Sequence, residues 1–324
     1  MLNEGETGFG STEFIVLRAK DGIADKDFIY YLTISPQFRD YAIKSMVGSS
    51  GRQRVQQDVL ENMYIDCPPI PEQKAIAAVL SALDDKIELN NRINKNLEAQ
   101  AQAIFKSWFV NFEPFRDGEF VDSELGQIPK GWEVTSYLKY ANLMGGGTPK
   151  TANLENWNGD IPFFTPKDIL DSYYSINTEK YLTDAGLNSC NSKLFAKDTV
   201  FVTARGTVGK IAISGVSMAM NQSCYAISSS KYSQYFIHQL TIYIVEKLKN
   251  KASGAVFDAL VTRDFEAERV IYPPTPIADK YTFLVKSLYE KILNNVEQNA
   301  ILSALRDTLL PKLITGEIRV PLEV

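Results

Sequence analysis

Two glycine-rich loops that carry lysine, MGGGTPKT at 144–151 and ARGTVGKIA at 204–212, hold the clearest candidates for binding chemistry. Neither matches the G-x-x-x-x-G-K-[ST] pattern of nucleotide-binding loops. Glycine lets main-chain N–H groups approach a phosphate, and the lysine and arginine side chains would supply positive charge. The loops predict contacts to a phosphate backbone, with plain turns and solvated lysines as the alternative. The predicted contact residues are Thr148, Lys150, Arg205, Thr207 and Lys210.

Two further segments carry polar side chains suited to reading base edges. They are FFTPKDI, with Thr165 and Lys167, and AMNQSC, with Asn221 and Gln222. Asparagine and glutamine make bidentate contacts to adenine, and lysine reaches guanine or phosphate. The alternative is that Asn221 and Gln222 bond to a neighbouring loop.

A third candidate, GSSGRQRVQQD, places Arg52, Gln53 and Arg54 on a glycine loop. The chain contains an internal repeat, and the segment that corresponds to this loop in the later copy is ASGAVFDALVTRD, which is apolar except at its end. A loop that differs this much between two related copies suits recognition of different sequences. A solvated turn is the alternative.

The sequence predicts no catalytic residue and no metal site. The single histidine, His238, lies among apolar residues in YFIHQLTIYIV and is expected to be packed in a core. The chain lacks the Asp-Pro-Pro-Tyr or Asn-Pro-Pro-Tyr motif of adenine methylation. Asp84 and Asp85 are expected on a solvated helix flank. The three cysteines lack metal-ligand spacing and are interpreted as packing residues: Cys67, Cys190 and Cys224.

The chain also contains two related segments that predict long helices. PPIPEQKAIAAVLSALDDKIELNN begins at Pro68, and PPTPIADKYTFLVKSLYEKILNN begins 205 positions later. Apolar residues recur at alternate steps of four and three, which predicts two helices of about 36 residues each packed along one seam. We expect Pro311 to end or kink the second helix. The seam residues are Leu83, Ile87, Asn90, Asn94, Leu97, Leu288, Ile292, Asn295, Asn299 and Leu302.

The repeated asparagines favour an antiparallel helix pair over two separate core helices. A buried amide stabilises less than leucine but fixes register. In an antiparallel pair Asn90 would face Asn299, and Asn94 would face Asn295. Such a pair acts as a spacer of roughly 54 Å at 1.5 Å per residue.

The rest of the chain divides into one whole unit and part of another. Residues 128–275 mix strand-like runs, glycine turns and a helical stretch, and residues 8–69 echo only their later part. The formal net charge is −5, but residues 128–275 hold 15 Lys and Arg against 13 Asp and Glu. That balance permits a local basic face without predicting one. The fold class is α/β (α+β).

The sequence resembles a type I restriction-modification specificity subunit over nearly the whole chain. The resemblance rests on QIPKGWEV, GGGTPKT, NWNGDIPFFTPKDI, ARGTVGKIAI, AMNQSCYAI, LLPKLITGEIRV and the two proline-to-helix passages. It implies two target-recognition domains separated by an antiparallel coiled coil. It also implies double-stranded DNA, two methyltransferase subunits and possibly the restriction subunit as partners. S-adenosylmethionine would be bound by those partners and no cofactor by this chain.

The expected organisation departs from the family pattern in its truncated first domain. It comprises a partial recognition domain (1–69), a first spacer helix (70–115), a complete recognition domain (116–275), and a second spacer helix with tail (276–324). The expected function is non-catalytic reading of a DNA half-site in the cytoplasm, away from membranes. The alternatives are an assembly scaffold or decoy, and a split subunit completed by another polypeptide.

Overall fold

The computed structural model describes residues 8, 10–11, 14–49, 53–170, 172–251 and 259–321. The chain divides into two compact units. The smaller unit comprises Met1–Leu89 and Gln298–Val324, and the larger unit comprises Asn90–Glu297.

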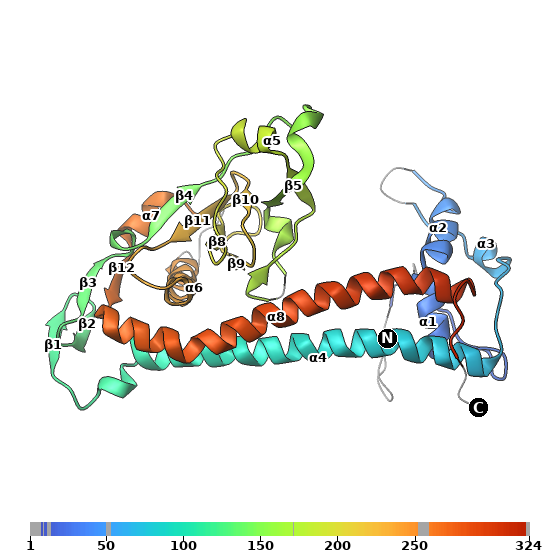
Figure 1. The fold of residues 1–324 in the computed structure, drawn as a ribbon, viewed down its shortest axis with the longest axis horizontal. Helices are drawn as coiled ribbons and strands as arrows, with labels where there is room; N and C mark the ends of the chain where they lie inside the picture. Colours follow the sequence, from blue (N-terminus) through green and yellow to red (C-terminus); the bar gives the residue numbers. More distant parts are fainter. Residues whose placement is uncertain are drawn as a thin grey trace. The chain divides into compact units, whose positions relative to one another are not determined.

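Two 40-residue helices, α4 (Ile70–Phe109) and α8 (Thr275–Ile314), contribute to both units (Figure 1). They are each somewhat longer than the expected 36 residues. The helix α8 continues three residues beyond Pro311, so this proline does not end the helix, and the alternative that it kinks the helix stays a prediction. Proline removes a single N–H donor here, in the last turn, where little helix remains to be broken.

The helices pack antiparallel within each unit. In the larger unit Asn94 bonds to Asn295, as predicted, and Phe105 lies 6.0 Å from the Tyr281 ring. In the smaller unit Asp84 pairs with Arg306. The pairing of the other two seam asparagines joins the two units and stays a prediction.

The seam is buried most completely around its asparagines. Asn90, Asn94, Ile292 and Asn295 are buried. The other seam positions are half-buried: Leu83, Ile87, Leu97, Leu288, Asn299 and Leu302. On α8 the buried face is wider than one seam, because this helix also packs against the rest of the larger unit.

The smaller unit adds three short helices, α1 (Lys26–Ile34), α2 (Pro36–Lys44) and α3 (Gln57–Glu61). The Asp25 side chain caps α1, and Ser35 ends α1 while capping α2. Its core joins α1 and α2 to the long helices through Phe28, Tyr31, Leu32, Phe38, Ile76, Ala77, Leu80, Leu310, Leu313 and Ile314.

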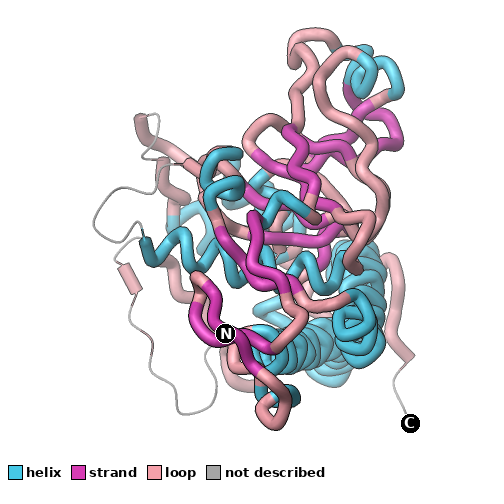
Figure 2. Tube along the Cα trace, turned by 90° about the vertical axis from the view of Figure 1, so that its left-hand side faces the viewer, coloured by secondary structure: helices cyan, strands magenta, loops and turns pink. Residues whose placement is uncertain are grey.

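The larger unit is built on short strands joined by long loops (Figure 2). In its described part a five-stranded sheet has the order β4 (Asn142–Gly145), β11 (Cys224–Ser228), β8 (Val200–Thr203), β9 (Ile211–Ser214), β6 (Tyr174–Ser175). A three-stranded sheet has the order β10 (Ala219–Met220), β5 (Trp157–Phe164), β7 (Lys180–Leu182). Two antiparallel pairs are β1 (Phe120–Ser123) with β2 (Gly126–Pro129), and β3 (Glu133–Ser136) with β12 (Arg269–Tyr272).

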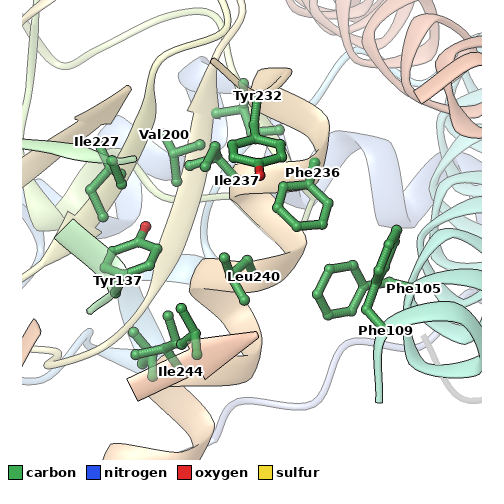
Figure 3. Packing of buried hydrophobic residues seen from close by; sticks show 14 of the residues in the cluster. Phe105, Phe109, Tyr137, Val200, Ile227, Tyr232, Phe236, Ile237, Leu240 and Ile244 are labelled. Atoms are coloured by element: carbon green, nitrogen blue, oxygen red, sulfur yellow. The ribbon is translucent and has the colours of Figure 1, made fainter. Parts of the chain in front are cut away.

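Helices complete the larger unit and cover its sheet. They are α5 (Asp184–Asn188), α6 (Gln234–Lys251) and α7 (Thr262–Ala267), with 3-10 turns η1 (Glu113–Phe115), η2 (Tyr137–Lys139), η3 (Leu154–Asn156) and η4 (Pro166–Asp168). The helix α6 contacts β8 and β11 on one side. On its other side Phe236 points toward Phe105 and Phe109 of α4 (Figure 3), with 5.0 Å between the Phe109 and Phe236 ring centroids. This core fixes the loops at the ends of the strands.

Candidate nucleic-acid interface

Four segments of the larger unit converge on a surface hollow of about 380 Å³. It gathers four residues that the sequence predicts for DNA contact, Thr165, Lys167, Arg205 and Asn221. The other lining residues are Pro166, Glu179, Lys180, Gly206 and Ser223.

Strand pairing explains why these segments meet. In the three-stranded sheet Phe164 pairs with Met220 and Phe163 pairs with Lys180. The chain leaving β5 therefore reaches Thr165 between the end of β10 and the start of β7. A hydrogen bond of 2.7 Å from Ala204 N to the Ser223 carbonyl joins the loop after β8 to the loop after β10.

A buried carboxylate, Asp168, ties together two of the segments that line the hollow. Its Oδ2 accepts hydrogen bonds of 2.7 Å from both the main-chain N and the hydroxyl of Thr165. Its Oδ1 accepts a 2.7 Å bond from the main-chain N of Glu179. Asp168 thereby ties the start of η4 to the start of β7 and sets the positions of Lys167 and Lys180.

The hollow carries more positive than negative charge. Lys167, Lys180 and Arg205 line it against the single carboxylate of Glu179. Neither Lys167 nor Arg205 forms an ion pair with any residue in the described ranges. The Lys180 ammonium lies 5.6 Å from the centroid of the Trp157 ring. Exposed cations that lack intramolecular partners are suited to phosphate groups.

The two predicted amide side chains are partly engaged within the protein. Asn221 Oδ1 accepts a 3.0 Å hydrogen bond from Ser223 N. Gln222 Oε1 accepts a hydrogen bond from the Thr148 hydroxyl. The alternative of bonding to a neighbouring loop therefore describes Gln222, whereas the Asn221 oxygen is bonded within its own loop. The amide nitrogens of both side chains are suited to donate to a base edge.

The remaining predicted contact residues do not line the hollow. Lys150 is exposed on the 144–151 loop. Thr207 and Lys210 belong to the hairpin between β8 and β9, where the Thr203 hydroxyl donates to the Thr207 carbonyl and accepts a 2.9 Å bond from Lys210 N. The main-chain groups of Thr207 and Lys210 stabilise the hairpin tip through these bonds to Thr203, and the Lys210 side chain is exposed.

Two glycines of the 144–151 loop, Gly146 and Gly147, allow close packing of neighbouring chain segments. A Cβ on Gly146 would lie 2.2 Å from the Asn221 carbonyl oxygen, and one on Gly147 would lie 2.7 Å from Asn191 N. The main-chain N of Gly147 is also bonded to the Met220 carbonyl at 3.1 Å. The prediction that these glycines expose N–H groups to phosphate is wrong for Gly147, because its N–H already has a partner.

The sequence of the chain matches the family described as "Type I restriction modification DNA specificity domain" over residues 2–99 and 129–303. The chain belongs to this family.

Individual relatives agree with the family match. The type I restriction enzyme MjaIX specificity subunit of Methanocaldococcus jannaschii is 32% identical over 93% of this chain and 71% of the relative. The HindI specificity subunit of Haemophilus influenzae is 27% identical over 95% of this chain and 81% of the relative. A solved S subunit of a type I restriction-modification system from M. genitalium superposes with a TM-score of 0.56 at 17% identity, over 91% and 74% of the two chains. That likeness shows a shared fold.

This member of the specificity-subunit family carries the last predicted DNA-contact loop in its smaller unit. Arg52 lies outside the described residues. Gln53 and Arg54 are exposed and line a separate groove there. Arg54 forms an isolated β-bridge with Val47.

The single histidine is the packed residue that the sequence predicts. His238 is fully buried on α6, and its Nδ1 shares a 2.8 Å hydrogen bond with the Tyr289 hydroxyl. Burial lowers the pKa of His238 to about 3, so the ring is neutral at physiological pH. A neutral ring shielded from water does not serve as a base for a bound substrate. No cluster of potential metal ligands occurs in the described ranges.

Two expectations about individual side chains are wrong. Cys67 is exposed, whereas Cys224 is buried as expected of a packing residue. Asp84 is not a solvated flank residue, because it accepts 2.7 Å hydrogen bonds from the Tyr31 hydroxyl and from Arg306. The partners of Asp84, Tyr31 and Arg306, come from other helices and could not be read from residue spacing.

No helix in the described part of the chain is long and apolar enough to span a bilayer.

A loop beside the hollow is held to the long helix α4. Glu98 accepts hydrogen bonds of 2.8 Å from Tyr173 N and 3.0 Å from the Ser172 hydroxyl. The Tyr173 hydroxyl donates to the Glu98 carbonyl at 3.1 Å. Burial raises the pKa of the Glu98 carboxyl. This anchor fixes the segment between η4 and β6.

Sequence reasoning missed Lys180 and Asp168. The T-P-K-D run of 165–168 fits the capping-box pattern, so Asp168 carried a usable signal. Lys180 carried none, because only the pairing of β5 with β7 brings it to the hollow.

Proposed function

We propose that this chain is the DNA-reading subunit of a type I restriction-modification complex. A recognition domain at 116–275 would read one half-site of a bipartite target in double-stranded DNA, and chemistry would come from partner subunits. The hollow supports this assignment, because it gathers three cations and a side-chain amide in a family described by DNA specificity. A local excess of positive charge on an acidic chain is the electrostatic footprint that DNA requires.

The lining residues suit distinct roles. Arg205 offers a planar fork of donors that matches guanine O6 and N7 or a phosphate. The Asn221 amide nitrogen is a donor for a base edge, since its oxygen is already bonded. Lys167 and Lys180 would meet phosphates as point charges.

DNA binding by the assembled complex tests this proposal. Methylation mapping defines the target, and affinity is then measured across salt concentrations for Lys167→Ala, Arg205→Ala and the exposed control Lys193→Ala. A lost phosphate contact weakens binding to all sequences and lowers the salt slope by about 0.9. A lost base contact costs about 1–3 kcal/mol and relaxes one target position. Affinities equal to that of the Lys193 variant would contradict the assignment.

The helix pair would dock two methyltransferase subunits, which bind S-adenosylmethionine, and the restriction subunit would join them. The spacer segments are 70–115 and 276–324, and the complex would work in the cytoplasm. On the larger unit Phe283 of α8 is 82% exposed and lies with Leu284 and Trp108 around a hollow of about 620 Å³. An exposed aromatic patch on a helix is suited to a protein partner.

Co-purification with the methyltransferase tests the docking patch. We expect Phe283→Asp to reduce methyltransferase retention at least tenfold, while Tyr243→Asp, another exposed aromatic of the same unit, retains it. Equal retention would place the docking surface elsewhere. Full retention without any sequence preference in DNA binding would instead favour the scaffold role.

A further inference from the structure

The hairpin of residues 204–210, between β8 and β9, carries three of the residues predicted for DNA contact: Arg205, Thr207 and Lys210. All three are exposed. A loose hairpin tip would have to be ordered when its side chains bind, and that ordering costs free energy. The contacts that fix this tip in the free protein therefore bear on its function.

The start of the hairpin is fixed by main-chain bonds. Ala204 N donates to the Ser223 carbonyl at 2.7 Å, and Leu260 N donates to the Ala204 carbonyl at 2.9 Å. Inside the turn, the buried Thr203 hydroxyl donates to the Thr207 carbonyl. These bonds hold the hairpin from its first residue to its tip.

The end of the hairpin is fixed by a side chain in the last turn of α6. The ammonium of Lys249 donates a 2.7 Å hydrogen bond to the Gly209 carbonyl. Gly209 is buried, and its φ of 72° is a left-handed conformation that favours glycine. A Cβ at Gly209 would lie 2.5 Å from Lys249 Cε and 2.9 Å from Val245 Cγ1. The lysine therefore contacts the hairpin with its stem as well as its ammonium.

Lys249 differs from the other two lysines near the end of α6. Lys247 and Lys251 form ion pairs with the buried carboxylate of Glu268, which precedes β12. Lys249 forms no ion pair with any residue that the structure describes. The three lysines thus fasten α6 to two different segments, and Lys249 is the one bonded to the predicted DNA-contact hairpin.

We propose that Lys249 is a positioning residue for DNA reading: it holds the 204–210 hairpin so that Arg205 and Lys210 meet the DNA without further ordering. This inference rests on the proposed DNA-reading function. It adds to that function a residue of α6 that does not line the hollow and that acts through the Gly209 carbonyl.

Specific DNA affinity of the assembled complex measures this role in a double-mutant cycle. Lys249→Met removes the donor and keeps an unbranched side chain, and we expect it to weaken binding about fivefold, the effect of one lost hydrogen bond. The comparison background carries Arg205→Ala and Lys210→Ala and so lacks both charged side chains of the hairpin. There Lys249→Met should weaken binding less than about twofold, because the residues that it positions are absent.

A direct contact between Lys249 and a phosphate predicts a different result. The loss would be the same in both backgrounds, because the lysine would act on DNA without the hairpin. A direct contact would also lower the salt slope by about 0.9. Lys193→Met removes an exposed lysine of the same unit and should leave affinity unchanged in both backgrounds.

A second variant leaves the charge of Lys249 in place. In Gly209→Ala the added methyl group would meet the lysine stem, so we expect a similar loss of specific affinity. Combining it with Lys249→Met should cost no more than either change alone, because both break one contact. Gly131→Ala is the control for backbone strain: Gly131 has a φ of 87°, and a Cβ there would meet nothing within 4 Å. It should bind DNA as the parent does.

Hydrogen exchange of the full chain reports on the hairpin without DNA. We expect Lys249→Met to speed amide exchange at residues 205–210 about threefold or more, because the hairpin opens locally more often. Exchange in β11, which pairs with the other edge of β8, should stay as in the parent. Lys193→Met should change neither segment.

Unchanged exchange in the hairpin would overturn the proposal. So would an equal loss of affinity on Lys249→Met in the parent and in the double-alanine background. If the double-alanine background itself binds target DNA as the parent does, the DNA role of the hairpin fails, and this inference fails with it. The exchange measurement separates these failures, because it needs neither DNA nor methyltransferase.

Discussion

Asn295 donates a hydrogen bond of 2.8 Å from its Nδ2 to the Oδ1 of Asn94, across 201 positions of sequence. Both side chains are at most 2% exposed, and Ile292 and Val296 beside them are buried as well. Sliding one helix along the other would leave both amides in apolar surroundings. The pair therefore fixes the register of α4 against α8 at the expense of some stability.

Removing one partner of this pair should destabilise the protein. In Asn295→Ala the Asn94 oxygen stays buried without its donor, which costs about 1–3 kcal/mol of unfolding free energy. Asn294→Ala, at the exposed neighbouring position, should be neutral or slightly stabilising because alanine favours helix. Urea unfolding measures both. Equal stability of the two variants would contradict a register role.

The helix pair was predictable because its signal is local and periodic. A 3.5-residue repeat with asparagines at matching places predicts both the seam and the antiparallel pairing of Asn94 with Asn295. The proline-to-helix passages mark where each helix begins. The last turn was less predictable, because a proline near a helix end removes little hydrogen bonding.

The site was predictable only in part, because its geometry depends on non-local strand order. Thr165, Lys167, Arg205 and Asn221 were found by residue type within loops, and they do line one hollow. Lys180 reaches that hollow only through pairing of β7 with β5. Sequence spacing does not encode which strands become neighbours.

Asp168 should support DNA binding because its hydrogen bonds position other residues, although its negative charge by itself disfavours DNA. In Asp168→Ala the Thr165 and Glu179 main-chain donors lose their acceptor, so Lys167 and Lys180 lose their fixed places. We expect specific DNA affinity to fall about tenfold. A purely electrostatic effect has the opposite sign, since removing an anion beside DNA favours binding.

A matched variant separates these effects. Asp160→Ala removes an exposed carboxylate from β5, the strand that precedes η4. It should leave specific affinity unchanged or slightly raised in a titration with target DNA. If both aspartate variants bind more tightly than the parent, the positioning role of Asp168 fails.

Two adjacent glycines should respond differently to alanine. In Gly146→Ala the new methyl group would meet the Asn221 carbonyl at 2.2 Å, so the loop must move, at about 1–3 kcal/mol. In Gly145→Ala the methyl group meets nothing within 4 Å, and the change should be within about 1 kcal/mol. Thermal or urea unfolding compares them. Similar losses in both would mean that the close approach at Gly146 is absorbed by loop adjustment.

The stability of the protein should depend on pH through its one histidine. The pKa of His238 is about 3 in the folded protein because of burial, against 6.5 for the ordinary side chain. Below pH 6.5 the unfolded chain binds a proton that the folded chain does not, so stability falls as pH falls from 6.5 toward 3. Its contribution is fully present above pH 6.5.

His238→Gln removes this dependence while retaining a hydrogen-bonding group near the Tyr289 hydroxyl. Between pH 7.5 and 5.5 the parent should lose about 1.4 kcal/mol more unfolding free energy than the variant, because one unit below the unfolded pKa is worth that amount. Urea unfolding at the two pH values measures the difference. Since the chain has one histidine, the carboxylates are common to both proteins and cancel in the comparison. An identical pH response in both would show that His238 takes up a proton in the folded state as readily as in the unfolded chain.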